Sequence, residues 1–145
     1  MVKPRILFLC TGNSCRSQMA EGIARHLRGA DLEAYSAGTK PQKLNPNAVK
    51  VMRELGIDIS SHNAKSVEDL GDVKFDFVIT VCDDAHESCP IWPGRGVVVH
   101  REFDDPPRLA ADSSSEEEAL KHYRRVRDEI KDFVLTLPQA MRGLT

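Results

Sequence analysis

The residues with the clearest chemical potential form one continuous segment, Cys10-Thr11-Gly12-Asn13-Ser14-Cys15-Arg16-Ser17. Because a glycine and small polar residues stand between Cys10 and Arg16, the backbone can curl and point its N–H groups inward. A helical pattern begins at Arg16 and adds the positive end of a helix. Amide dipoles, a helix N-terminus and a guanidinium all favour a thiolate, so Cys10 is a candidate nucleophile. The same donors suit a tetrahedral oxyanion such as phosphate or arsenate, two of whose oxygens the fork of Arg16 can hold.

Two further cysteines could take part in chemistry at the same place. Cys82 follows a β-branched and aromatic run, residues 75–81, that predicts a strand. If this strand lies beside the first strand, their tips are about 5 Å apart, and Cys82 can reach a group attached to Cys10. A helix would hold Cys82 and Cys89 about 10 Å apart, beyond the limit of about 7 Å for a disulfide. The weak helix formers between them favour unwinding, which would let this segment act as a redox switch.

Two other interpretations of the cysteines remain open. Free cysteines are among the most buried residues, so three of the four could be inert core thiols. The spacings from Cys10 to Cys15 and from Cys82 to Cys89 do not match the CxxC pairs of structural zinc sites, and we predict no metal. Five histidines lack the spacing of metal ligands as well, and we expect surface or packing roles for His26, His62, His86, His100 and His122.

A candidate acid lies in the segment Asp104-Asp105-Pro106-Pro107. An oxygen that leaves a tetrahedral oxyanion must be protonated, so a carboxylic acid should lie over the loop of Cys10. The segment follows a predicted strand and can arch back across the strand ends. We predict Asp105 as the acid, because the proline that follows it stiffens the chain. An isolated Asp-Pro is more typical of a turn than of a catalytic group.

The elements that must position these residues alternate between strands and helices. Strands are predicted over residues 5–9, 32–37, 75–81 and 96–100, and helices over 16–28, 46–55 and 115–137. We expect at most a helical turn at 66–70, a loop at 101–114 and a frayed tail at 139–145. The alternation predicts a single three-layer α/β/α domain over residues 1–145, with a four-stranded parallel sheet in the order 2-1-3-4. Ligands bind such sheets at the carboxyl ends of the strands, where Cys10 and Cys82 both lie.

Composition narrows the classes of function. The chain has 145 residues, of which 41% are hydrophobic, and can build one proper core. With 20 basic against 22 acidic residues, it lacks the broad positive surface of a nucleic-acid-binding protein. The apolar stretch at residues 6–9 is too short for a signal peptide, and no apolar run could span a membrane. We therefore expect a cytoplasmic protein with reduced thiols and no nucleic-acid or membrane partner.

These motifs resemble those of the thioredoxin-coupled arsenate reductases, which share the fold of the low-molecular-weight protein tyrosine phosphatases. The resemblance runs almost end to end and covers residues 6–10, 16–22, 56–60, 82, 89–90, 103–106 and 125–130. It implies an arsenic-detoxifying enzyme that reduces arsenate to arsenite and binds no cofactor, with thioredoxin as the external reductant. Glutaredoxin is the alternative reductant, and we expect a monomer.

The resemblance also implies roles for individual residues. Cys10 attacks arsenate, with a proton from Asp105, and the surrounding loop binds the oxyanion through Thr11, Gly12, Asn13, Ser14, Cys15, Arg16 and Ser17. Cys82 then attacks Cys10, which releases arsenite and leaves a Cys10–Cys82 disulfide. Cys89 attacks Cys82, and thioredoxin reduces the resulting Cys82–Cys89 disulfide. The thiol of Cys15 is expected to be a spectator.

The main alternative is a low-molecular-weight protein tyrosine phosphatase, which hydrolyses phosphate monoesters through a phosphorylated Cys10. That chemistry has no use for Cys82 and Cys89, and such phosphatases usually carry proline where Gln18 stands. These features favour the reductase, with weak phosphatase activity as a remnant. A non-enzymatic oxyanion or thiol sensor is less consistent with an acid at Asp105.

One departure from the family concerns potassium. Some members bind this ion with residues that match Asn13, Glu21 and Ser36 and with a later threonine and aspartate. The last two positions carry Asn63 and Lys65 here. Because a lysine ammonium can neutralise Glu21 in place of the ion, we predict no potassium site.

Overall fold

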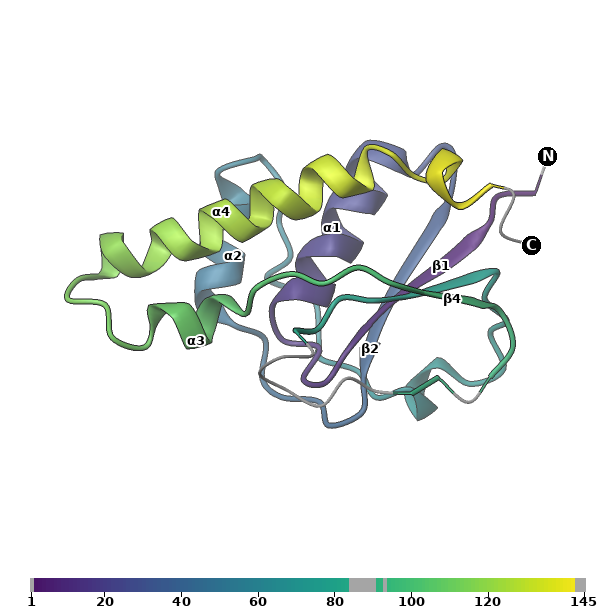
Figure 1. Cartoon of the computed structure of the whole chain (residues 1–145), viewed down its shortest axis with the longest axis horizontal. Coiled ribbons are helices and arrows are strands. Elements are labelled where there is room, and N and C mark those ends of the chain that lie inside the picture. The colour runs from purple at the N-terminus through teal and green to yellow at the C-terminus, as the bar shows by residue number, and fades with distance from the viewer. Residues whose placement is uncertain (1, 84–90, 93, 143–145) are drawn as a thin grey trace.

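The computed structural model describes residues 2–83, 91–92 and 94–142. Its centre is a four-stranded parallel sheet in the order β2-β1-β3-β4, formed by β1 (Arg5–Cys10), β2 (Glu33–Gly38), β3 (Phe77–Thr80) and β4 (Val97–His100). The predicted α/β class and strand order are confirmed. Since β1 and β3 pair in parallel, the segments that follow Cys10 and Thr80 leave the sheet at the same end. Figure 1 shows β1, β2 and β4 of this sheet.

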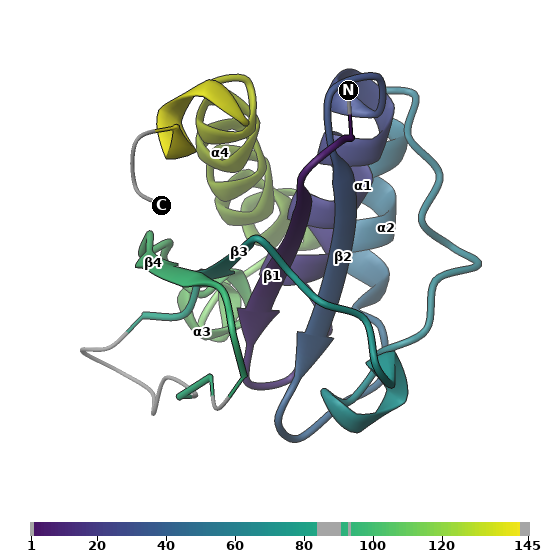
Figure 2. The ribbon, with the colours of Figure 1, turned by 90° about the vertical axis from the view of Figure 1, so that its right-hand side faces the viewer.

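Helices cover one face of the sheet. α1 (Arg16–Arg28) packs on β1 and β2, α4 (Glu116–Val134) packs against α1, and α2 (Pro46–Arg53) lies beside both helices (Figure 2). Their apolar positions form one core with alternate residues of the strands, including Ile6, Phe8, Met19, Ile23, Met52, Val126 and Ile130. Burial of each such side chain contributes about 1.5–3 kcal/mol. Among the described residues, no helix is long and apolar enough to cross a membrane.

Capping residues mark the starts of two helices. Asn45 Oδ1 accepts hydrogen bonds from Asn47 N at 2.8 Å and from Ala48 N at 3.4 Å, at the N-terminus of α2. Ser115 Oγ accepts one from Glu118 N at 3.1 Å, at the N-terminus of α4. Each of these bonds satisfies an amide that the helix leaves unpaired. The caps therefore fix where α2 and α4 begin.

Short segments cover the opposite face of the sheet. Leu7 and Leu9 of β1 point to this side and pack with Phe75. The 3₁₀-helix η1 (Glu68–Leu70) forms the single helical turn predicted in this region. Trp92 lies edge-on to Phe75, with 5.8 Å between the ring centroids. Both faces of β1 are buried, which is why its sequence is a continuous apolar run.

The structure differs from three element predictions. A helix, α3 (Pro106–Ala110), lies inside the segment 101–114 that is predicted as a loop. Its two prolines occupy the first helical positions, where a proline has no amide hydrogen bond to lose. The predicted frayed tail instead begins with a 3₁₀-helix, η2 (Gln139–Met141), held by the buried side chain of Met141. The strand predicted over 75–81 is shorter, because β3 covers only its middle.

Candidate active site

The loop from Cys10 to Ser17, called the cradle below, is held in shape by Asn13. Asn13 has a positive φ of 49°, a conformation that asparagine adopts more readily than most residues. Its buried side chain donates to Ser17 Oγ at 2.8 Å and accepts from Lys65 N at 2.8 Å. Gln18 Nε2 donates to the backbone and side-chain oxygens of Asn13, at 3.2 and 3.0 Å. Buried side chains therefore brace the cradle from within.

A second segment, residues 38–45, supports the cradle through the backbone. Three of its N–H groups donate to cradle carbonyls: Lys40 N to Thr11 O at 2.9 Å, Gln42 N to Gly12 O at 2.8 Å and Asn45 N to Ser14 O at 2.9 Å. At Gly38, a Cβ atom would lie 2.4 Å from Thr11 O, so only glycine lets the end of β2 come this close. Because these carbonyls point outward, the amides between them can face the inside of the cradle.

Cys10 lies at the base of the cradle and is 3% exposed. Its sulfur lies 3.0 Å from Ser17 Oγ and accepts a hydrogen bond from Asn13 N at 3.3 Å. Because Asn13 Nδ2 donates to Ser17 Oγ, the hydroxyl hydrogen of Ser17 is available to the sulfur. Two donors therefore face the Cys10 sulfur, as a nucleophilic thiolate requires.

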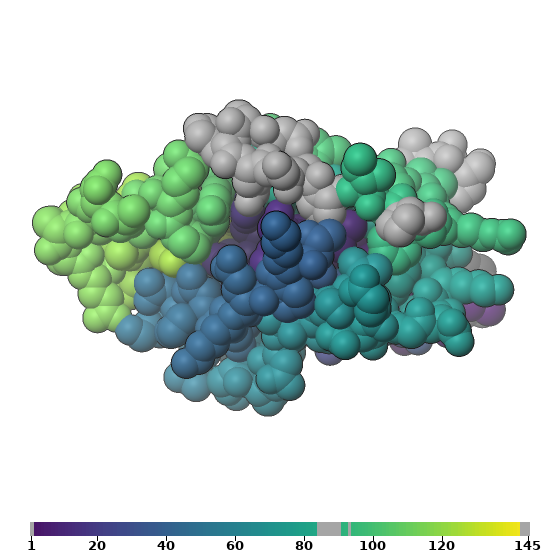
Figure 3. Space-filling view, turned by 90° about the horizontal axis from the view of Figure 1, so that it is seen from below, coloured from purple at the N-terminus to yellow at the C-terminus, as the bar shows by residue number. Residues whose placement is uncertain are grey.

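A cavity of about 200 Å³ opens over Cys10. It is lined by the cradle, the segment after β2 and the start of α3, through Cys10, Thr11, Gly12, Ser14, Cys15, Arg16, Gln42, Asp105 and Pro107. The N-terminus of α1 has no side-chain cap, so its first amides remain available to an anion. In Figure 3 the purple atoms of the amino-terminal part lie in a hollow beside the blue segment after β2. The cavity combines a sulfur nucleophile with donors for an oxyanion.

Arg16 and Asp105 meet at the edge of this cavity. The guanidinium of Arg16 is buried, and its Nη1 donates to Phe103 O at 3.0 Å. Its Nη2 lies 3.7 Å from Asp105 Oδ1. Asp105 precedes the first residue of α3, and its side chain makes no capping hydrogen bond. The structure thus brings the carboxyl group of Asp105 over the cradle, and its role as the acid remains a prediction.

Cys82 lies just beyond β3, next to the start of the cradle. Val81 N donates to Leu9 O at 3.0 Å, so the pairing of β1 with β3 continues to the residue before Cys82. The sulfur of Cys82 is disulfide-bonded, whereas Cys10 and Cys15 are free thiols. The bond of Cys82 therefore does not involve Cys10, and the predicted Cys10–Cys82 disulfide is not formed in this structure. Cys89 lies outside the described residues.

The predicted oxyanion-binding residues fall into two groups. Most of them line the cavity, but Asn13 and Ser17 do not line it and are fully buried within the cradle. The thiol of Cys15 lines the cavity, and burial raises its pKa well above the usual range, which suits a spectator. Gln42 also lines the cavity, although it was not predicted. The sequence gives no signal for Gln42, because it reaches the site through a contact of residues far apart in the chain.

Gln18 and His62 form a support that the sequence did not predict. Gln18 is fully buried, and its Nε2 also donates to Asn63 O at 2.9 Å. Its Oε1 lies 3.1 Å from His62 Nδ1, which carries the hydrogen in this arrangement. Burial lowers the pKa of His62, although the carboxylate of Glu21 acts in the opposite direction. A packing role for His62 is correct, and its hydrogen bond connects it to the cradle.

Glu21 is one of the residues that match the potassium-binding residues of some family members. Its carboxylate is 2% exposed and accepts a hydrogen bond from Ser36 Oγ at 2.9 Å. Two cationic side chains also approach it: Arg25 at 3.3 Å and Lys65 at 3.8 Å. This surplus of positive charge does not fit an additional cation. No cluster of metal-ligating side chains occurs in the described part of the chain, and the absence of a metal site remains a prediction.

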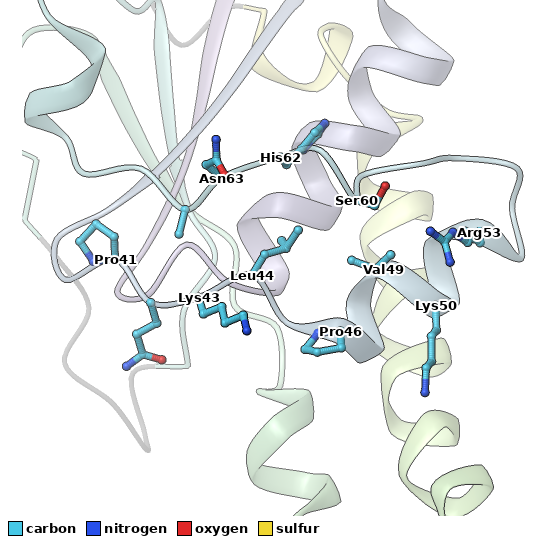
Figure 4. Close-up of a pocket in the computed structure, with 12 residues that line it drawn as sticks. Pro41, Lys43, Leu44, Pro46, Val49, Lys50, Arg53, Ser60, His62 and Asn63 are labelled. Atoms are coloured by element: carbon cyan, nitrogen blue, oxygen red, sulfur yellow. The ribbon is translucent and has the colours of Figure 1, made fainter.

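A larger cavity of about 710 Å³ lies between α2, the segment 41–46 and the segment 60–64. Its walls are mainly apolar, with basic side chains at the rim (Figure 4). Lys43, Lys50 and Arg53 point in different directions rather than toward one point. Lys50 is also paired with Glu116. Because no group of polar side chains converges there, the smaller cavity over Cys10 is the better candidate for chemistry.

Comparison with known proteins identifies the family of this chain. The family model described as low molecular weight phosphotyrosine protein phosphatase matches residues 5–143. The chain belongs to this family. Within the family, its relatives include proteins named arsenate reductase. One from Shouchella clausii is 49% identical and covers 90% of this chain and 91% of its own length. Another, from Bacillus subtilis, is 48% identical, with 86% and 88% covered.

Solved structures agree with this assignment to the phosphatase family. An arsenate reductase in the phosphate-binding state superposes with a TM-score of 0.75 at 31% identity, and 94% of this chain and 96% of that chain are covered. A low-molecular-weight protein tyrosine phosphatase from T. tengcongensis superposes with a TM-score of 0.71 at 29% identity, with 95% and 99% covered. The family resemblance seen in the sequence is confirmed, and both activities occur among its structural neighbours.

Proposed function

We propose that this member of the phosphatase family reduces arsenate to arsenite with a relay of three cysteines. The observation that carries the proposal is the position of Cys82 at the strand end beside the cradle of Cys10. Hydrolysis of a phosphate ester needs one nucleophile and one acid, whereas reduction needs a second thiol to accept the bond from Cys10. Relatives that are 48–49% identical are named arsenate reductase, which supports the same choice.

In the first step, the cradle binds arsenate and Cys10 attacks it. The amides at the start of α1 and the fork of Arg16 hold the equatorial oxygens. The Cys10 thiolate forms a sulfur–arsenic bond, and one oxygen leaves as water after it takes a proton from Asp105. Arg16 is fixed by Phe103 O, so its donors are already aligned when charge develops on the oxyanion. No change of oxidation state has occurred at this point.

In the second step, the thiolate of Cys82 attacks the sulfur of Cys10. The sulfur–arsenic bond breaks, and its electron pair stays on arsenic, which leaves as arsenite. A Cys10–Cys82 disulfide remains, so the two thiols have supplied the two electrons that arsenic gained. Cys82 is fully buried in the structure and follows the strand that pairs with β1, so bulk water does not reach its side chain.

In the third step, Cys89 attacks Cys82 and frees Cys10. We propose that the resulting Cys82–Cys89 disulfide is reduced by the dithiol of thioredoxin, which loses two electrons and restores both cysteines. The cycle needs no bound cofactor and no metal. It suits the cytoplasm, where thioredoxin is kept reduced. A Cys82 that is disulfide-bonded while Cys10 is free is consistent with the last intermediate of this sequence.

A phosphatase is the second candidate, because a structural neighbour is a low-molecular-weight protein tyrosine phosphatase. A paired assay separates the two functions. We expect Cys82→Ser to lower multi-turnover arsenate reduction with thioredoxin by on the order of 100-fold or more, because the bond exchange has no second thiol. Hydrolysis of an aryl phosphate should stay within about twofold, because the cradle and acid are intact.

Cys10→Ser is the control variant and should abolish both reactions. Undiminished arsenate reduction by Cys82→Ser would show that the relay is wrong. If the wild-type protein hydrolyses aryl phosphate rapidly and does not reduce arsenate, it is a phosphatase.

A further inference from the structure

Asp83 is a buried acidic residue that the mechanism above does not use. It directly follows Cys82, and only 3% of its side chain is exposed. Burial of a carboxylate is costly unless a counter-charge lies close to it. Arg108 supplies such a charge, because its Nη2 lies 3.6 Å from Asp83 Oδ2. The structure thereby connects the residue next to the second thiol with the helix α3.

Arg108 lies close in the chain to the proposed acid. α3 begins at Pro106, directly after Asp105. Arg16, in the cradle, contacts two residues that precede α3: it donates to Phe103 O and lies near the carboxylate of Asp105. Arg108 contacts the other side, where Asp83 follows the second thiol. The guanidinium groups of Arg16 and Arg108 therefore connect the segment of Asp105 and α3 to the cradle and to the residue after Cys82.

The two members of the outer pair differ in their access to water. The side chain of Arg108 is 39% exposed, compared with 3% for Asp83. If the carboxylate of Asp83 is removed, water can solvate the guanidinium. If the guanidinium is removed, the buried carboxylate loses this counter-charge and gains little contact with water, because only 3% of its side chain is exposed. We expect the Cys82 segment to shift in response, because the burial of the Asp83 carboxylate is then less well compensated.

We propose that Arg108 is a positioning residue that keeps Cys82 against the cradle because it neutralises the buried carboxylate of Asp83. The inference rests on the proposed reductase function, in which the Cys82 sulfur must meet the Cys10–arsenic bond in line. A thiolate attacks a sulfur opposite the leaving group, so a small displacement of Cys82 misaligns the reacting atoms. Arg108 acts through Asp83 and touches neither the oxyanion nor the sulfur atoms.

The first test is a cycle of variants in arsenate reduction with thioredoxin. We expect Arg108→Gln to lower kcat about tenfold and to leave KM for arsenate within about twofold, because the cradle is unchanged. Asp83→Asn should cost only about twofold, since Arg108 is then solvated. The double variant Asp83→Asn with Arg108→Gln should return to the level of Asp83→Asn, and Arg108→Lys should keep most of the activity.

Aryl phosphate hydrolysis by the same variants separates positioning from a general structural effect. A merely structural role would lower hydrolysis and reduction together, and the double variant would be worse than either single variant. Either result, or a kcat for Arg108→Gln equal to that of the wild type, would overturn the proposal.

A second readout does not depend on arsenate reduction. Iodoacetamide is added to the fully reduced protein, and the rate of alkylation of Cys82 is followed by peptide mass spectrometry. We expect Arg108→Gln to raise this rate about tenfold and the double variant to restore it, with Cys15 as the buried internal reference. If the wild type fails to reduce arsenate but this pattern holds, the proposed function is wrong and the positioning role of Arg108 stands. An unchanged alkylation rate contradicts the positioning role itself.

Discussion

The cradle and the Cys82 segment lie side by side but are held by different kinds of contact. Buried amide and hydroxyl groups fix the cradle, with Asn13 bonded to both Ser17 and Gln18. Beyond β3, by contrast, the residue next to Cys82 is paired with an arginine that is partly exposed to solvent. The difference matches the two tasks that we propose for these parts. A site that binds and activates an oxyanion benefits from fixed donors, whereas a cysteine that exchanges its partner must be able to move.

Among the variants that test the difference between the cradle and the Cys82 segment, we expect removal of the proposed acid, Asp105, to have the largest effect on activity. We expect Asp105→Asn to lower both arsenate reduction and aryl phosphate hydrolysis by about 100-fold, because each needs a proton on the leaving oxygen. The affinity for inorganic phosphate should change little. Reduction of the Cys82 disulfide by thioredoxin, measured in the oxidised protein, should be unaffected. Asp104→Asn is the matched control, since Asp104 pairs with Arg125 outside the cavity. If thioredoxin no longer reduced the Cys82 disulfide of Asp105→Asn, the cradle and the Cys82 segment would not act separately.

Substitution of Asn13 tests how far the shape of the cradle depends on this one side chain. Asn13→Ala removes the hydrogen bonds to Ser17 and Lys65 and places alanine at a positive φ. We expect a loss of about 2–4 kcal/mol in the free energy of unfolding and a fall of about tenfold in phosphate affinity. Asn13→Gly separates the causes, because glycine tolerates the backbone conformation but lacks the side chain. Chemical denaturation and phosphate titration measure the two effects. Equal stability of Asn13→Ala and the wild type would show that the cradle does not depend on this side chain.

Substitution of His62 should give the smallest effect, and this effect should appear only in the free energy of unfolding. Burial lowers the pKa of His62 in the folded protein, so folding favours the neutral imidazole. The stability that this contributes is complete above the unfolded pKa of about 6.5 and is lost as the pH falls below it. Between about pH 7.5 and pH 5, we expect the Tm of His62→Gln to fall less than that of the wild type. The difference should correspond to under about 1 kcal/mol in the free energy of unfolding. The exposed His26 supplies the control His26→Gln. A Tm of His62→Gln that falls as steeply as that of the wild type would contradict this assignment.

The contiguous parts of the site could be predicted from the sequence. The cradle is one uninterrupted segment whose glycine, arginine and following helix signal its shape. The caps at Asn45 and Ser115 form within three residues along the chain, so local rules suffice to place them. The position of Cys82 followed from the order of the strands. These predictions depend on local sequence or on topology, and both are encoded over short distances.

The supports of the site could not be predicted, because they join residues that are far apart in the chain. Gln18 and His62 are 44 residues apart and meet only in the folded protein. The pair of Asp83 and Arg108 depends on α3, which was predicted as part of a loop because its segment, with Pro106 and Pro107, is rich in proline and aspartate. At the first helical positions the same prolines start a helix. Residue type alone did not distinguish these two uses of proline.

In the proposed relay, Cys82 breaks the bond between Cys10 and arsenic. A single turnover of the variant Cys89→Ser tests it most directly. The reduced variant is mixed with excess arsenate in the absence of any other reductant, and arsenite and disulfides are measured together. We predict one equivalent of arsenite per protein and a Cys10–Cys82 disulfide in the peptide map. Release of arsenite while Cys10 is still a free thiol would show that Cys82 does not break this bond. The same conclusion would follow if a variant that binds phosphate normally released no arsenite.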